Sequence, residues 1–460
     1  MMFRLMLAAL AAFALPLPAL AQVAPDAATL RDAALHDDIA WDIVEGLTTE
    51  VGQRLAATDA EARGREWAVA KLKALGFQNV HIETFKMPVW VRGEEKAEIL
   101  SPFPQKLVIA ALGNSGSTGP KGVEAEVVYF PTLADLEAAP ESAVKGKIVF
   151  ISHAMMPTQD GSSYGPFGQA RRKGPAVAAQ KGAVAVLIRS VGTDHHRNPH
   201  TGGTNWPKGV TPIAAAALPL PDAEQLERVI KRGQPVRMRL LITPQFKGEG
   251  ESGNVIAEVP GSDPSAGIVL VGGHLDSWDL GTGAIDDASG LAITTAAAKR
   301  IMDAGQPRRT IRVVWFGAEE PGGFGGEAYA KAHAGERHVV AAESDFGADR
   351  IWKFDVNLPE SAKGVTDRLT AALAPLGIAK GHDIAGDGTD VGPMMKLGVA
   401  AIDLAQDGTH YFDLHHTPDD TLDKIDPGAL RQNVAAWTAM LAIVANAPEE
   451  IGPVTPKPGS

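Results

Sequence analysis

Short apolar runs alternate with longer segments of helical spacing in the second half of the chain. The runs have the continuous hydrophobicity of strands buried on both faces, and they occupy residues 254–259, 267–273, 310–318 and 398–405. The segments with apolar positions at three- and four-residue intervals occupy residues 290–305, 366–377 and 429–447. This alternation predicts an α/β fold, in which helices cover a mostly parallel, twisted sheet.

The first half of the chain has a different texture. Residues 58–76 have the spacing of one helix, but from residue 103 to residue 246 short β-like runs are separated by loops rich in proline and glycine. We expect residues 103–246 to form a smaller, β-rich domain. This domain would be inserted between the two parts of a larger one, residues 22–102 and residues 247–460.

The N-terminal segment has the pattern of a secretory signal. Arg4 precedes an apolar run that ends near Pro16 and Pro18, and small residues follow them. These features predict that residues 1–21 are a signal peptide, cleaved after Ala21. No later segment of the sequence is apolar for long enough to span a bilayer. The mature protein is therefore expected to be exported, either to a periplasm or out of the cell.

Charge and cysteine content narrow the function further. The chain carries a formal net charge of −12 at pH 7 and contains no cysteine. Such an acidic chain is poorly suited to nucleic acid or to an anionic membrane surface, so we expect neither as a partner. Without thiols, any metal ion must be held by histidine and carboxylate side chains.

Acidic residues and histidines gather where the predicted strands end. One cluster follows residues 267–273, a second follows residues 310–318, a third surrounds Asp345, and a fourth lies at the histidine pair 415–416. The carboxyl ends of parallel strands meet at one edge of a sheet, so we expect these clusters to share one centre. The side chains concerned are His274, Asp276, Asp286, Asp287, Glu319, Glu320, Asp345, His415, His416, Asp419 and Asp420.

Buried acids at this density require cations, and the residue types fit a pair of divalent ions. A two-zinc site needs a carboxylate that bridges the ions, histidine and carboxylate ligands on each ion, and a further carboxylate that takes a proton from the attacking water. Glu319 is the expected proton acceptor. The five expected ligands are His274, Asp286, Glu320, Asp345 and His416.

Five separated pieces of the sequence resemble the motifs of peptidase family M28, a family of zinc aminopeptidases. They occur in the family's order, and they read HLD, GAIDDASG, GAEE, ESDFGAD and HTPDD. The resemblance implies a zinc-aminopeptidase-like α/β fold, two zinc ions per chain and hydrolysis of peptide bonds. The inserted region is similar to the protease-associated (PA) domain of relatives of this family, which implies a lid over the substrate cleft. A purely structural insert is the alternative.

The resemblance also implies which residues hold the metals. The first zinc ion would be held by His274, Asp286 and Asp345. Asp286 would also bridge to the second ion, which Glu320 and His416 would complete.

Two further carboxylates receive catalytic roles from the same resemblance. Glu319 would take the proton from the attacking water and pass it to the leaving amine. Asp276 would accept a hydrogen bond from the second ring nitrogen of His274 and fix its tautomer. The family pattern also implies a cis peptide bond between Asp286 and Asp287.

Contacts with the substrate follow from weaker signals. The candidate substrate-binding residues are His415, Tyr411, Asp390 and His200. Either ring of the pair 415–416 could be a metal ligand, and the family's pattern selects His416. Asp420 is either an acid that supports the ligands or the N-cap of a helix.

Together these features predict a secreted or periplasmic dinuclear zinc exopeptidase. Its expected partners are dipeptides or short peptides with a free amino terminus, which makes it an aminopeptidase or dipeptidase, and the resemblance suggests a homodimer. Two alternatives stay open. One is a non-enzymatic binding protein of this fold that has lost its metals, and the other is an acyltransferase of the glutaminyl cyclase type with a single zinc ion.

Overall fold

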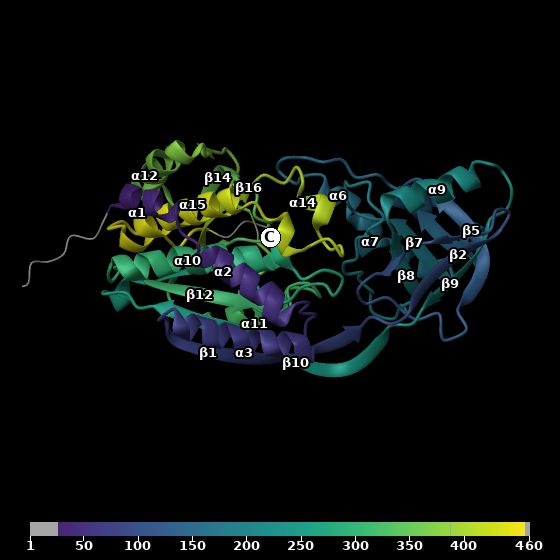
Figure 1. Cartoon of the computed structure of the whole chain (residues 1–460), viewed down its shortest axis with the longest axis horizontal. Coiled ribbons are helices and arrows are strands. Elements are labelled where there is room, and N and C mark those ends of the chain that lie inside the picture. Colours follow the sequence, from purple (N-terminus) through teal and green to yellow (C-terminus); the bar gives the residue numbers. More distant parts are fainter. Residues whose placement is uncertain (1–25, 387, 456–460) are drawn as a thin grey trace, which may run out of the picture.

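Two eight-stranded sheets, each with its own helices, make up the part of the chain that the structure describes, residues 26–386 and 388–455. In this computed structural model the two sheet units lie side by side along the long axis of the molecule (Figure 1). The expected signal peptide, residues 1–21, lies outside the described residues. Over the described ranges, no helix combines the length and the hydrophobicity needed to cross a membrane.

The first unit contains the sheet that the alternating pattern predicts. Its central strands β12, β11, β13 and β16 are parallel, and β10 and β14 flank them as antiparallel partners. In sheet order the strands are β1 (Gln78–Val91), β10 (Gln245–Val259), β12 (Thr310–Phe316), β11 (Ile268–His274), β13 (His338–Glu343), β16 (Ala400–Gln406), β14 (Ile351–Asn357) and β15 (Ala379–Lys380). β11 and β12 are buried along almost their whole length, which explains their continuous apolar sequences.

Helices pack on both faces of this sheet, because alternate residues of one strand belong to two different cores. In β11, Val269 and Val271 share a core with α10 and α15, whereas Leu270 packs with α11 and α13. Trp315 and Trp437 are fully buried in the first core, and truncating such a side chain typically costs about 3–5 kcal/mol. The helices of this unit are α1 (Ala27–Ala34), α2 (Ile39–Gly46), α3 (Asp59–Ala74), α10 (Ser289–Ala304), α11 (Phe324–His333), α12 (Lys363–Leu373), α13 (Gly392–Lys396), α14 (Tyr411–Leu414) and α15 (Pro427–Asn446).

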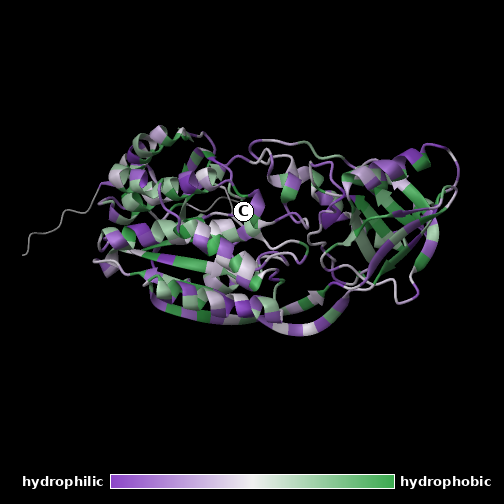
Figure 2. Cartoon of the chain, in the orientation of Figure 1, coloured by the Kyte–Doolittle hydropathy of each residue, from purple (hydrophilic) through white to green (hydrophobic). Residues whose placement is uncertain are grey.

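The second unit is built from the residues between β1 and β10. Three successive parallel pairings join β5, β6, β7 and β8. In sheet order its strands are β3 (Gln105–Leu107), β2 (Glu95–Ser101), β9 (Arg237–Ile242), β5 (Val123–Phe130), β6 (Ile148–Ile151), β7 (Ala185–Arg189), β8 (Ala214–Leu218) and β4 (Ala110–Ala111). Its helices are α4 (Leu133–Ala138), α5 (Glu141–Val144), α6 (Tyr164–Phe167), α7 (Gln169–Arg172), α8 (Gly174–Gln180) and α9 (Leu220–Ile230). Figure 2 shows hydrophobic residues concentrated on the strands inside both units.

The second sheet begins before residue 103. β2 pairs with β9 of the second unit, and β9 ends at Ile242. By its strands, the second unit therefore spans residues 95–242. Residues 95–101 belong with this sheet and not with the first part of the larger domain, because their pairing partner lies in the inserted segment.

The chain passes between the units at two neighbouring points. β1 leads out of the first unit and β10 leads back, and the two strands pair side by side, with Val91 opposite Gln245. Near this crossing, Trp278 of the first unit packs edge-on against Trp90, with ring centroids 6.3 Å apart, and joins the core of the second unit. An ion pair of 2.8 Å between Arg92 and Asp279 adds to the contact. These contacts hold the second unit against the first.

Candidate metal centre

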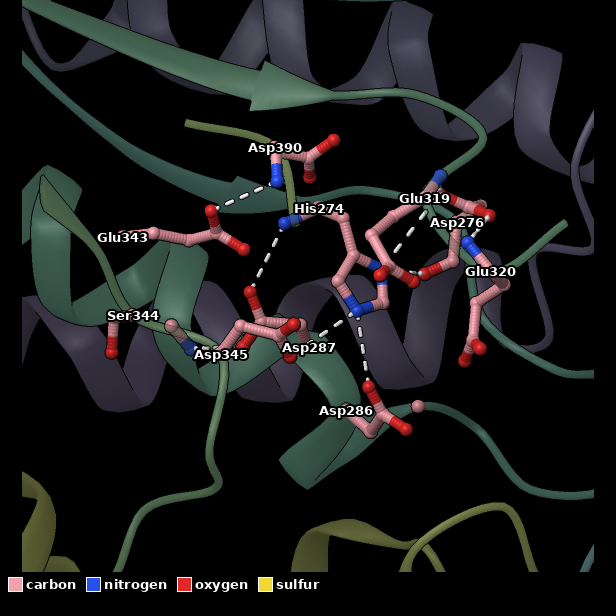
Figure 3. Close-up of polar contacts among 12 residues, drawn as sticks. His274, Asp276, Asp286, Asp287, Glu319, Glu320, Glu343, Ser344, Asp345 and Asp390 are labelled. Atoms are coloured by element: carbon pink, nitrogen blue, oxygen red, sulfur yellow. Dashed lines mark hydrogen bonds and ion pairs between the residues drawn. The ribbon is translucent and has the colours of Figure 1, made fainter. Parts of the chain in front are cut away.

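Three neighbouring parallel strands deliver most of the predicted side chains to one place. His274 is the last residue of β11, Glu319 and Glu320 follow the end of β12, and Asp345 follows β13. These strands are adjacent and parallel, so their carboxyl ends lie at the same edge of the sheet. Figure 3 shows the side chains of this cluster gathered around the ring of His274.

Asp286 lies at the centre of the cluster. It lies in the segment η3 (Ala284–Ala288), where its backbone and that of Asp287 depart from helical geometry, and the peptide bond between these two residues is cis, as the family pattern implies. Its Oδ1 lies 3.0 Å from Nε2 of His274, and its Oδ2 lies 3.2 Å from Nε2 of His416. One carboxylate thus faces two histidines that come from separate segments of the chain.

Each of these histidines has a second carboxylate beside it. Oδ1 of Asp345 lies 3.4 Å from Nε2 of His274, and Oε2 of Glu320 lies 3.1 Å from Nε2 of His416. Three sets of side chains have donor atoms within 4.8 Å of one another, and they are Asp286 with His415 and His416, His274 with Asp286 and Glu320, and His274 with Asp287 and Asp345. Nitrogen and oxygen donors at this spacing suit dications such as zinc.

Buried carboxylate oxygens support a cation at this position. Oε1 of Glu320 accepts no hydrogen bond from the described residues, and Oδ2 of Asp286 faces histidine ring nitrogens, at 3.2 Å from His416 and 3.6 Å from His415. A buried carboxylate oxygen without a partner costs free energy unless a positive charge meets it. The residues present therefore fit metal ions held by nitrogen and oxygen donors alone.

The charges within the cluster are unbalanced. Burial raises the pKa of Glu319 well above its ordinary value, and the nearby charge of Asp345 adds to this effect. Burial raises the pKa of Asp345 as well. Burial also opposes the charge of Asp286, but hydrogen bonds from His274 and His416 hold the pKa of that carboxyl well below its usual range. Asp286 therefore takes its counter-charge from two imidazolium rings, in the place where metal ions would supply it.

The other ring nitrogens of the two histidines lie beside carbonyl groups. Nδ1 of His274 lies 2.8 Å from the carbonyl oxygen of Asp276, and Nδ1 of His416 lies 3.3 Å from that of Thr201. A carbonyl oxygen accepts but cannot donate, so each Nδ1 carries the hydrogen. In the neutral ring, Nε2 is then the nitrogen that can bind a metal.

Asp276 does not make the contact that the family resemblance implies. Its Oδ1 is 3.7 Å from Nδ1 of His274, because the carbonyl group of Asp276 already occupies that nitrogen. The carboxylate instead accepts the backbone N–H of Glu319 at 3.0 Å and that of Glu320 at 3.2 Å. Asp276 therefore positions the expected base and its neighbouring ligand through their backbone.

Asp287 fixes the backbone of His274, one of the expected ligands. Its carboxylate is fully buried and accepts the N–H groups of His274 and Gly290, both at 3.0 Å. This close approach requires glycine at position 273, where a Cβ atom would lie 2.1 Å from Oδ2 of Asp287. Burial raises the pKa of Asp287 well above its ordinary value, and the charge of Asp345 raises it further.

Arg54 and Asp420 hold the loop that precedes Asp286. The Arg54 side chain is fully buried and donates to carbonyl groups at both ends of residues 275–283, over 2.6 to 3.0 Å. Oδ1 of Asp420 accepts the first two N–H groups of η3, both at 2.7 Å. Asp420 thus supports the ligand loop, and the helix cap position that follows it is Thr421.

A cavity of about 370 Å³ opens beside the cluster. The predicted ligands and base that line it are Asp286, Glu319, Glu320, Asp345 and His416. Of the four candidate substrate-binding residues, His415 and Tyr411 also line this cavity.

Asp390 and His200 are not placed to touch a substrate. Both side chains are fully buried, and neither lines the cavity. The backbone N–H of Asp390 donates to Glu343 behind the cluster. The ring of His200 lies behind His415, whose carbonyl oxygen is 2.7 Å from its Nδ1. The sequence shows that these residues are near the site in the fold, but it does not show which way their side chains face.

The second unit supplies cavity residues that the sequence did not single out. Arg171 and Arg172 of α7 and Tyr164 of α6 line the cavity together with the metal-cluster residues. The backbone N–H of Thr201 also donates to the carbonyl oxygen of His416 at 3.0 Å. No motif marks these residues, because they reach the site from a separate unit of the chain.

Comparison with known proteins agrees with this site. A sequence model of peptidase family M28 matches residues 254–441. Carboxypeptidase Q of Bos taurus is 35% identical over 406 residues, which cover 88% of this chain and 84% of the relative. Carboxypeptidase Q of Homo sapiens is 33% identical over 408 residues, with 88% and 84% covered.

Solved structures extend the comparison to the fold. The crystal structure of a peptidase M28 precursor from Shewanella amazonensis SB2B is 48% identical, covers 94% of this chain and 98% of its own, and superposes with a TM-score of 0.91. The zinc aminopeptidase BSAP from Bacillus subtilis is 19% identical, covers 90% and 97%, and has a TM-score of 0.65, which is a likeness of fold. The carboxypeptidase Q sequences and the Shewanella amazonensis peptidase are more than 30% identical to this chain over most of both chains, which shows membership of one family. The chain therefore belongs to peptidase family M28 and is a peptide hydrolase, as its motifs predicted.

Proposed function

We propose that this chain is a dinuclear zinc exopeptidase that hydrolyses dipeptides or short peptides with a free amino terminus. The observation that carries the proposal is the position of Asp286, whose two oxygens face histidines from separate segments at 3.0 and 3.2 Å. A carboxylate placed in this way suits a bridge between two metal ions. The relatives named carboxypeptidase Q support cleavage at a chain end.

In this proposal, His274 and Asp345 would hold one ion, Glu320 and His416 would hold the other, and Asp286 would serve both. When bound, two zinc ions supply Lewis acidity, which polarises the scissile carbonyl and acidifies the attacking water. The expected ligands His274 and Glu320 are themselves held in position, because carboxylates accept their backbone N–H groups at 3.0 and 3.2 Å.

Glu319 is the residue that moves protons. It lines the cavity beside the expected ligands, and among the described residues it lies outside the sets whose donor atoms converge. Its carboxylate takes a proton from the attacking water and then delivers it to the nitrogen of the leaving amine. Asp276 holds the N–H of Glu319 at 3.0 Å, which keeps the base in place during the transfer.

We also propose that the enzyme works after export and that the second unit is a PA-type domain that shapes the substrate cleft. The signal-like sequence of residues 1–21 supports export, and the cavity residues from α6 and α7 support a role of the second unit at the cleft. The homodimer rests on the family resemblance alone. Light scattering on the purified protein tests it, because a dimer has twice the mass of the chain.

A dipeptide library with matched end-blocked controls tests the activity. We expect the zinc-loaded protein to cleave free dipeptides and to lose that activity when the amino end is acetylated. Cleavage that is indifferent to acetylation would overturn the exopeptidase assignment. Elemental analysis of the same protein separates the two-zinc enzyme from a single-zinc acyltransferase, since the proposal requires two ions per chain.

A further inference from the structure

Two adjacent arginines form a cationic wall in the cavity that holds the acidic cluster. Arg171 and Arg172 come from α7 of the second unit, and the same cavity is lined from the first unit by Glu319, Glu320 and Asp345. Figure 1 places α7 on the side of the second unit that faces the first. The cavity thus has acidic groups from one unit and guanidinium groups from the other.

No carboxylate among residues 26–386 and 388–455 pairs with either guanidinium group. In the part of the chain that the structure describes, Arg171 and Arg172 form no ion pair, whereas other arginines of the second unit do. Arg189 pairs with Glu224 at 2.9 Å, and Arg197 pairs with Asp222 at 2.8 Å. A partly buried cation without a counter-ion is costly, so a cationic wall of this kind favours binding of an anion.

The two arginines differ in how much hydrogen-bonding capacity they retain. Arg171 is 4% exposed, its amino groups donate to the hydroxyl of Tyr164 and to the carbonyl of Thr201 at 3.3 Å, and one of them packs 3.3 Å from Nδ1 of His416. Arg172 is half-buried and donates from one amino group to the carbonyl of Gly165 at 2.8 Å. Because a guanidinium has five N–H donors, most of those on Arg172 stay available to a ligand.

Packing holds the side chain of Arg172 in place. Its guanidinium carbon lies 5.5 Å from the ring centroid of Tyr164, within the range of a cation–π contact. The backbone carbonyl of Arg172 accepts the N–H of Asn205 at 3.0 Å, and Asn205 lines the same cavity. An arginine held in this way can present a planar pair of donors to a carboxylate without much loss of side-chain entropy.

The size of the cavity limits which carboxylate can reach Arg172. Its volume of about 370 Å³ is near the lower end of the range for small-ligand sites, roughly 300–1,000 Å³. In a dipeptide, the terminal carboxylate is only one residue beyond the scissile bond. A peptide bond held beside Glu319 therefore leaves that carboxylate inside the same cavity, whereas a longer peptide carries it further away.

We propose that Arg172 is a specificity residue, which binds the terminal carboxylate of a dipeptide and makes free dipeptides better substrates than their amides or longer peptides. The inference rests on the proposed exopeptidase function and deepens it. Arg171 supports the wall by its charge and by its contact with Tyr164, and Arg172 makes the direct hydrogen bonds.

The test compares alanyl-alanine with alanyl-alanine amide, which differ only in the charged terminus. We expect kcat/KM of the zinc-loaded enzyme to favour the free dipeptide by about tenfold to hundredfold, the usual effect of hydrogen bonds to a charged group. Arg172→Ala should reduce this preference to about twofold or less, by lowering kcat/KM for the dipeptide. Arg172→Lys should restore part of the preference, because lysine keeps the charge but not the paired donors. The matched control, Arg197→Ala, should leave the ratio unchanged, because Arg197 pairs with Asp222 outside the cavity.

The outcomes separate the inference from the function on which it rests. If the enzyme hydrolyses both substrates but Arg172→Ala leaves their ratio unchanged, the carboxylate role is wrong and the peptidase function stands. If the enzyme hydrolyses neither substrate, the proposed function fails. Titration calorimetry of metal-depleted protein then decides the binding role, which requires wild type to bind the dipeptide more tightly than the amide and Arg172→Ala to lose that difference. Thermal unfolding and zinc content of each variant check that the fold is intact.

Discussion

The acids at the strand ends of the first unit and a buried acid of the second unit differ in how their charge is balanced. In the first unit, Glu319 and Asp345 crowd together at strand ends, and burial raises the pKa of both carboxyl groups. In the second unit, the buried carboxylate of Asp222 is paired with Arg197 at 2.8 Å and also accepts the N–H of Val108 at 2.6 Å. Asp222 is thus neutralised within the second unit, whereas the strand-end cluster of the first unit keeps negative charge that added cations would balance. The metal centre therefore depends on the residues at the strand ends of one sheet, and not on sheet architecture in general.

The largest expected effect tests whether Glu319 acts as the proton acceptor while the other strand-end acids act as metal ligands. Glu319→Gln removes the proton acceptor and leaves the expected ligands in place. We predict that kcat falls by at least about a thousandfold while the zinc content stays unchanged, since general-base contributions reach roughly 10²–10⁴-fold. Turnover measurements with elemental analysis check this. Glu327→Gln, an exposed change on α11, is the control and should keep full activity. Full activity in Glu319→Gln would remove the proposed mechanism.

A smaller effect tests how far the second unit supports the metal centre. The ring of His200 joins Asp194 at 2.8 Å to the carbonyl of His415 at 2.7 Å, next to the proposed ligand His416. We predict that His200→Ala weakens binding of the zinc ion that His416 would hold by about tenfold to hundredfold, as loss of a supporting contact typically does. Chelator competition measures this affinity.

His338→Gln provides the matched control for that experiment. His338 is also buried and bonds to the hydroxyl of Tyr329 at 2.8 Å, away from the metal cluster. Its substitution should change stability but not zinc affinity. Equal zinc affinity in His200→Ala and wild type would show that the first unit forms the metal site unaided.

The smallest expected effect concerns stability: replacing Asp403 by asparagine should stabilise the protein at pH 8, whereas the same change at Asp222 should destabilise it. Burial and the nearby Asp355 raise the pKa of Asp403 to about 6. This folded value is above the unfolded value, so the stability that the protonated form contributes is lost as pH rises from about 4 through 6. We predict that Asp403→Asn is more stable than wild type by roughly 1–2 kcal/mol at pH 8, and that the gap closes toward pH 4. Urea unfolding at several pH values measures it.

Asp222→Asn should have the opposite effect at neutral pH. This change breaks the ion pair with Arg197 and weakens the hydrogen bond from Val108, which costs roughly 1–3 kcal/mol. If both variants lost stability at pH 8, the contrast between the two sheets would not extend beyond the metal cluster.

The sequence predicted the elements and motifs of the first unit well, because both depend on local spacing. The apolar runs marked buried parallel strands, and the chemistry of their ends marked a common centre. Local spacing does not show which way a side chain points. The backbone carbonyl of Asp276, and not its carboxylate, contacts His274, and the side chain of Asp390 is buried in the protein interior. Contacts between the two units could not be predicted from local sequence patterns either, because residues such as Arg171 and His416, which are in contact, lie 245 positions apart in the sequence.

The paired crossing strands have a consequence for how enzymes of this design can diversify. The chain leaves the first unit along β1 and returns along β10 at a neighbouring point, so a recombination event at these two junctions can exchange everything between them without reordering the rest of the fold. Such an exchange replaces the arginine wall and leaves the strand-end acids untouched. Selection can therefore retune which peptides are accepted while the acids and histidines that the first unit supplies stay in place.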